Sequence, residues 1–196
     1  MMLRTASLLL LVVFGIAAQP PQKPLWLDAA PKPWNRPGGK VPRAEKLLRR
    51  NEDELLLKMC QARIRKPATP QEVEVAGKGW MLFASWRDGS GRDIIVVGAM
   101  ANFDGMCRPD LYQDFVFVNG VYAGTLSPLP MNARSDGSSA TVAFPEPGKI
   151  YAEFARYSAK DPLCCASRIS EATYEIQDVR GKPVVALASV RTRPSN

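Results

Sequence analysis

Four cysteines carry the most specific chemistry in this sequence: Cys60, Cys107, Cys164 and Cys165. In an exported protein, an even number of cysteines predicts disulfide bonds. A bond between the adjacent Cys164 and Cys165 would close a very small ring, outside ordinary disulfide geometry. We therefore expect each of these two to pair with Cys60 or Cys107, and which pairs with which stays open. The alternative is a redox-active Cys164-Cys165 pair, although the C-x-x-C spacing of thiol oxidoreductases is missing.

Aspartates and arginines gather in segments that we expect to form loops. The candidate binding residues are Asp104, Arg108, Arg134, Asp136, Arg156, Asp161 and Arg168. If disulfides bring 104–110 beside 161–168, several of them meet at one end of the fold, where arginines can bind an anionic group. A solvent-exposed salt-bridge network is the simpler interpretation. A pair of carboxylates, Asp104 with Asp136 or Asp161, could instead hydrolyse a glycan.

The sequence contains no histidine, which excludes several kinds of catalytic and metal site. Ser-His-Asp and Cys-His catalysis, H-E-x-x-H zinc sites and H-x-E deaminases all require histidine. We expect no metal, no cofactor and no catalytic residue set. An enzyme with this composition would depend on carboxylates, Lys, Tyr or Cys for proton transfer.

A β-hairpin centred on Asn119-Gly120 is the strongest structural signal. Aromatic and β-branched residues alternate on both sides of this pair, from Phe115 to Ala123, and Asn-Gly tolerates the positive φ angles of a type I′ turn. Apolar runs bounded by turn residues predict further strands at 80–86, 92–101, 140–144, 149–157, 168–178 and 184–190. We predict an α+β fold, mainly antiparallel twisted β-sheet of about six to eight strands with one or two N-terminal helices, held by disulfides.

Two helices are predicted before the strands. Residues 43–66 place Leu48, Leu55 and Met59 on one face, with Leu47 and Leu56 beside them, as in an amphipathic helix. Thr69-Pro70-Gln71-Glu72 forms a capping box with proline at the first helical position, and Gly77 is expected to end this short helix.

Residues 1–18 are predicted to be a signal peptide. Arg4 precedes an apolar run from Leu8 to Ile16 that is too short to span a bilayer, and small residues follow it. We therefore expect an exported protein, periplasmic or extracellular, with no stable membrane anchor after cleavage.

The next segment, residues 19–42, is rich in proline and contains Trp26 and Trp34. We interpret it as a linker or an extended arm. Residues 43–196 are expected to form the domain of helix plus antiparallel β-sheet. The net charge of +7 and pI of about 9.4 suit an anionic partner, although solubility explains them equally. No run of five like charges and no nucleic-acid motif is present, so we expect no nucleic-acid partner.

Several short stretches together have a specific order and spacing. They are Asp104–Pro109, Phe115–Gly120, Ala123–Pro128, Met131, Arg134, Asp136, Gly137, Phe154–Tyr157 and Asp161–Arg168. Through them, residues 102–174, and more weakly 51–190, resemble the bacterial LppP/LprE lipoprotein domain family. The resemblance implies an exported, β-rich domain of the cell envelope and brings no catalytic residues with it. Unlike lipid-anchored members, this chain has no cysteine directly after the apolar run.

These observations favour a binding or interaction module of the cell envelope over an enzyme. Its partner is expected to be an unknown envelope protein or an anionic ligand. Two alternatives remain open: a carboxylate-based hydrolase acting on envelope glycan, and a thiol redox protein using Cys164-Cys165.

Overall fold

The computed structural model describes residues 25–46, 51–89 and 91–195, and the predicted signal peptide lies outside them. Within these residues, eight strands form two four-stranded antiparallel sheets in which consecutive strands are neighbours. The first sheet contains β1 (Met81–Asp88), β2 (Ile94–Phe103), β3 (Pro109–Val118) and β4 (Val121–Thr125). The second contains β5 (Ser138–Ala143), β6 (Lys149–Arg156), β7 (Arg168–Val179) and β8 (Lys182–Pro194). The predicted fold class is confirmed, with the strands divided between two sheets.

The hairpin between β3 and β4 forms as predicted. Val118 pairs with Val121 across the turn. Asn119 has φ 50° and Gly120 has φ 78°, so both central residues adopt the left-handed conformation that a type I′ turn requires. This turn fixes β4 as the edge strand of the first sheet.

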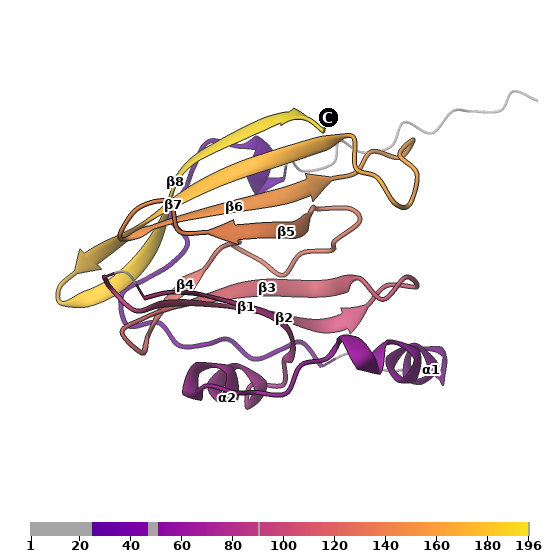
Figure 1. The fold of residues 1–196 in the computed structure, drawn as a ribbon, viewed down its shortest axis with the longest axis horizontal. Helices are drawn as coiled ribbons and strands as arrows, with labels where there is room; N and C mark the ends of the chain where they lie inside the picture. Colours follow the sequence, from indigo (N-terminus) through magenta and orange to yellow (C-terminus); the bar gives the residue numbers. More distant parts are fainter. Residues whose placement is uncertain (1–24, 47–50, 90, 196) are drawn as a thin grey trace, which may run out of the picture.

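The two sheets stack face to face, and the helices lie on the outer side of the first sheet (Figure 1). Along β2, Ile94 and Val96 point into the core between the sheets, while Ile95 and Val97 point to the outer side. There they pack in a second apolar cluster that includes Val75 of the helix layer. Because both faces of β2 are covered, its sequence is continuously apolar instead of alternating.

The short helix α2 (Pro70–Ala76) has the predicted capping box. The Thr69 hydroxyl accepts a hydrogen bond from the backbone N–H of Glu72, whose carboxylate accepts one in return from the backbone N–H of Thr69. Gly77 is the C-terminal cap. The helix therefore begins and ends where its sequence predicts.

The longer predicted helix is shorter than expected. It comprises α1 (Asn51–Cys60) and the 3₁₀ turn η2 (Gln61–Arg63). Leu48 lies outside the described residues. Leu55 and Met59, predicted on the buried face, are 60% and 68% exposed, whereas Leu56, Leu57 and Cys60 pack against the core. The prediction was wrong because the disulfide at Cys60, and not the strongest apolar stripe, sets the rotation of this helix.

The predicted disulfide pairing is also wrong. Cys60 is bonded to Cys107, and Cys164 is bonded to Cys165. The first bond ties the end of α1 to the turn between β2 and β3. The second lies in an exposed turn between β6 and β7, and it joins no separate parts of the fold.

Candidate functional site

The described part of the proline-rich segment, residues 25–42, and the residues that follow it to 46 form an arm along both sheets. It begins beside the second sheet, at the 3₁₀ turn η1 (Trp26–Asp28), and reaches the helix side of the first sheet (Figure 1). The Trp26 ring packs edge-on against Phe154, with 5.6 Å between centroids, and against Trp34 at 5.4 Å. These two tryptophans hold the arm against the core between the sheets.

Asn35 joins the arm to both edge strands. Its side-chain amide donates hydrogen bonds of 2.9 Å to the backbone oxygens of Thr125 on β4 and Val185 on β8, and it accepts one of 2.9 Å from the Thr125 N–H. Gly124 makes this approach possible, because a Cβ at that position would overlap the Asn35 side chain. Asn35 thus covers the free edge of β4 and fixes the position of the residues that follow it.

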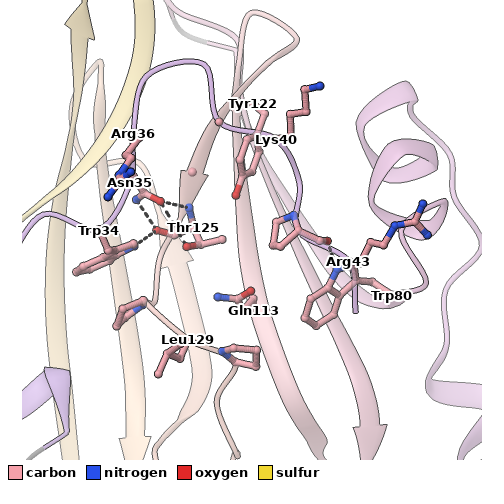
Figure 2. A pocket seen from close by; sticks show the side chains of 15 residues that line it. Trp34, Asn35, Arg36, Lys40, Arg43, Trp80, Gln113, Tyr122, Thr125 and Leu129 are labelled. Atoms are coloured by element: carbon pink, nitrogen blue, oxygen red, sulfur yellow. Dashed lines mark hydrogen bonds between the residues drawn. The ribbon is translucent and has the colours of Figure 1, made fainter. Parts of the chain in front are cut away.

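A groove with a volume of about 430 Å³ lies between the arm and the first sheet (Figure 2). Residues of the arm from Trp34 to Arg43 form one wall, β3 and β4 form the other, and the loop 128–130 lies at one end. Volumes of this size are usual for small-ligand sites.

Three aromatic rings line the groove: Trp34, Trp80 and Tyr122 (Figure 2). The indole N–H of Trp34 donates to the Thr125 oxygen at 3.1 Å, and that of Trp80 donates to the Pro42 oxygen at 2.8 Å. Because both indole N–H groups are occupied, these two rings offer a ligand only apolar contact.

Gln113 and Tyr122 supply polar atoms that the protein does not use. Gln113 lies in the middle of the groove in Figure 2 and is only 4% exposed. Its amide donates to the Ser127 oxygen at 3.2 Å, and its Oε1 has no partner among the described residues. The Tyr122 hydroxyl is also without a partner there. Burial, together with nearby Glu74, raises the pKa of Tyr122, so its hydroxyl stays protonated and can donate a hydrogen bond.

Three cations stand at the groove: Arg36, Lys40 and Arg43. All three are exposed, and none forms a salt bridge or a side-chain hydrogen bond with another described residue. In the part of the chain that the structure describes, no carboxylate lines the groove. The site therefore combines apolar rings, one free acceptor, one free hydroxyl and uncompensated positive charge, which suits an anionic ligand.

The binding loops predicted from the sequence do come together in part. Arg134 donates to the backbone oxygens of Asp161 at 2.8 Å and Pro162 at 3.2 Å. Arg108 donates to the Asp104 carboxylate at 2.6 Å and to the Leu163 oxygen at 3.2 Å. These arginines fasten the 158–165 turn to the rest of the molecule.

The same two arginines share an aromatic ring. The guanidinium carbon of Arg134 lies 4.5 Å from the Tyr157 ring centroid and that of Arg108 lies 5.6 Å away. A guanidinium group held by an aromatic face and by backbone oxygens has a structural role. These cations are therefore less available to a ligand than those of the groove.

The predicted carboxylates are likewise engaged. Burial raises the pKa of Asp104, but hydrogen bonds from the Arg108 and Met106 N–H groups and from the Arg108 side chain bring it below its usual value. The hydroxyl and N–H of Ser158 hold the pKa of Asp161 well below its usual range. A general acid needs a raised pKa, so neither group suits that role.

Asp136 accepts a hydrogen bond of 2.8 Å from the Asn132 N–H. The carboxyl group in this cluster with a raised pKa is Asp110, mainly because it is partly buried and because Asp104 and Asp136 lie nearby.

Arg156 and Arg168 do not join the loop cluster. Arg156 is 3% exposed. It donates to the Asp28 carboxylate at 2.7 Å and to the Ser170 hydroxyl at 3.0 Å. Arg168 is its cross-strand partner on β7 and is exposed. Arg156, predicted to bind an anion, thus forms an internal ion pair with the arm, and Arg168 lies apart from the loop cluster.

The sequence analysis did not identify the groove residues Arg36, Lys40, Arg43 and Gln113. A signal was present for the first three, because Lys32, Arg36, Lys40 and Arg43 are the charged residues between Ala29 and Ala44, with no acid among them. For Gln113, in contrast, the sequence gives no signal, because a polar residue in an alternating strand ordinarily faces solvent.

By its fold and contacts, the described chain is a two-sheet antiparallel β domain with a disulfide-linked helix and an arm that closes a small groove. The family model of the LppP/LprE lipoproteins matches residues 91–179, just under half of the chain. The predicted resemblance is therefore confirmed over β2 to β7, the region that is similar to these lipoproteins. No curated protein and no solved structure is significantly similar to the chain.

The matched region contains one wall of the groove, with Gln113, Tyr122 and Thr125, and the arm lies outside it. No helix in the described ranges is long and apolar enough to cross a membrane.

Proposed function

We propose that this protein is an exported binding module of the cell envelope that takes an anionic ligand into the groove between the arm and the first sheet. One observation carries the proposal: Arg36, Lys40 and Arg43 stand over a groove that no carboxylate of the described residues lines. Uncompensated charge beside a cavity attracts ions of the opposite sign.

This proposal moves the anion site away from the loops predicted from the sequence. Arg108, Arg134 and Arg156 already donate to oxygens of the protein itself. Part of their charge and donor capacity is therefore used within the protein, and a ligand would compete with these bonds. The cations of the groove have no such bonds to break.

Titration of the purified, exported protein with tripolyphosphate, a small polyanion without rings, tests the proposal by NMR. The indole N–H signals of Trp34 and Trp80 report on the groove, and that of Trp86 on β1 serves as an internal control. We expect the first two signals to shift, the third to stay, and the apparent affinity to fall as salt is added.

Two matched variants complete this experiment. The triple variant Arg36→Gln, Lys40→Gln, Arg43→Gln is expected to lose the shifts. The control Arg63→Gln, Lys58→Gln, Arg168→Gln removes the same types and number of charges from exposed positions outside the groove, and is expected to keep them. Equal loss in both variants would reduce the effect to net charge and overturn the proposed site.

A further inference from the structure

We infer that the ligand of the groove is an acidic glycan, in which a sugar ring carries a carboxylate or phosphate group. This inference rests on the proposed function and narrows it to one class of ligand. It depends on what the groove offers besides positive charge.

The rings of the groove provide a flat apolar contact surface. Trp34 and Tyr122 are half-buried and both line the groove, and the Tyr122 ring points into it (Figure 2). Leu129 at the loop end is 70% exposed and adds apolar surface to the groove. A simple inorganic anion would use none of this surface, whereas the C–H face of a sugar ring would cover it.

The free polar atoms favour hydroxyl groups on the ligand. Among the described residues, the Oε1 atom of Gln113, on a side chain that is 96% buried, is an acceptor without a donor, and the Tyr122 hydroxyl is a donor without an acceptor. A hydroxyl group is both a donor and an acceptor, so adjacent sugar hydroxyls satisfy both atoms. A carboxylate or phosphate alone could only accept, and would leave Gln113 Oε1 unpaired.

An acidic peptide is the main competing ligand, and the arm disfavours it. Extended peptides commonly bind by adding a strand to a free sheet edge. Here the β4 edge at Thr125 is occupied, because its N–H donates to Asn35 and its oxygen accepts from Asn35 and Trp34. The groove therefore offers side chains, not backbone, to its ligand.

Isothermal titration at fixed ionic strength tests the ligand class. The probes are an oligogalacturonate, a phosphorylated oligomannose, an uncharged oligosaccharide of the same length and an oligoglutamate of the same charge. We expect an acidic glycan to bind about tenfold more tightly than the oligoglutamate, and the uncharged sugar to bind far more weakly. Whichever acidic glycan binds more tightly identifies the acid group as carboxylate or phosphate.

Two variants separate recognition of the sugar from recognition of the charge. Gln113→Met removes the acceptor, and Tyr122→Phe removes the hydroxyl while keeping the ring that packs against Phe117. Each is expected to lower the glycan affinity about tenfold and to weaken tripolyphosphate binding, which depends mainly on the three cations, far less. Gln177→Met and Tyr157→Phe are matched controls outside the groove and should change neither.

The two proposals fail in different ways. If oligoglutamate binds as tightly as the glycans, or if Gln113→Met and Tyr122→Phe have no effect, the glycan inference is overturned while tripolyphosphate binding still supports an anion site. If no anion shifts the Trp34 and Trp80 signals and no glycan binds, both proposals fall.

Discussion

In the arm groove, Arg36, Lys40 and Arg43 contact no carboxylate of the described chain, whereas Arg108 and Arg134 near the Cys164-Cys165 turn are each held by several oxygens. The two regions have similar positive charge in the sequence. They differ in what surrounds the charge. The loops contain aspartates and a turn whose backbone oxygens accept hydrogen bonds from the arginines, whereas the arm contains prolines and aromatic residues. Charge that is compensated within the fold stabilises it, and charge that is left over is available to a ligand.

The two disulfides differ in a parallel way, and this difference gives the largest expected effect. Cys60–Cys107 spans 47 residues and joins α1 to the turn beside Asp104, whereas Cys164–Cys165 spans one. In the chain-entropy model, replacing the first pair by serine should lower the free energy of unfolding by about 4 kcal/mol, and replacing the second by less than about 1 kcal/mol. Urea denaturation without reductant measures both. Equal losses would mean that the vicinal bond also fastens the loop region.

The second prediction compares Arg156 with its cross-strand neighbour Arg168. Arg156→Ala removes a buried guanidinium that binds Asp28 and Ser170, and should cost about 3 kcal/mol. This lies at the low end for a buried ion pair because the Asp28 side chain is 39% exposed. Arg168→Ala should cost less than about 0.5 kcal/mol. If both variants unfold at the same urea concentration, the contact between arm and second sheet contributes little.

The sequence predicted the local features of the fold well. The Asn119-Gly120 turn and the Thr69 capping box are specified by a few adjacent residues, and both form as expected. The division into two sheets, in contrast, depends on contacts between distant strands, and no short pattern encodes it. The face of α1 was wrong for the same reason, since the distant partner Cys107 orients it.

The site was harder to predict than the fold. The predicted loops do meet at Tyr157, but their charges satisfy one another and the backbone. The groove exists only because Asn35 fixes the arm across Gly124, residues that lie far apart in the chain. A sequence shows which side chains are charged, but the partners that neutralise them become visible only in the fold.

Asp114 is the reverse case, a carboxyl group that forms no ion pair with the described residues, and it gives the third prediction. It lies on β3 and is 2% exposed, and its Oδ1 accepts no hydrogen bond in the described structure. Burial raises the pKa of Asp114 to about 7, and the nearby Ser139 hydroxyl offsets this only partly. In the folded protein Asp114 stays protonated up to about pH 7, whereas in the unfolded chain, where its pKa is lower, it ionises at lower pH. The free energy of unfolding therefore falls as the pH rises towards 7.

As the pH rises from about 5 to about 8, ionisation of Asp114 should lower the free energy of unfolding of the wild type by about 2 kcal/mol. The variant Asp114→Asn should not show this loss. Urea denaturation of both proteins at each pH isolates the difference from the effects of other carboxyl groups. If the free energies of unfolding of the wild type and of Asp114→Asn changed in parallel with pH, the Asp114 carboxyl group would have a hydrogen-bond partner in solution. A steeper loss in the variant would contradict the sign of the prediction.

The smallest expected effect is the most direct test of the comparison between the two basic regions. The triple variant Arg36→Gln, Lys40→Gln, Arg43→Gln should leave the free energy of unfolding unchanged or raise it by about 0.5 kcal/mol. The reason is that repulsion among the unpaired cations is relieved and no bond is lost. The double variant Arg108→Gln, Arg134→Gln should instead lower it, since hydrogen bonds to Asp104 and Asp161 disappear. Urea denaturation at low and high salt distinguishes the two, because salt screens repulsion in the groove and would shrink the gain. A groove triple variant that loses stability as the loop variant does would show that these cations have partners within the protein, and that the arm region, like the loops, uses its charge to hold the fold.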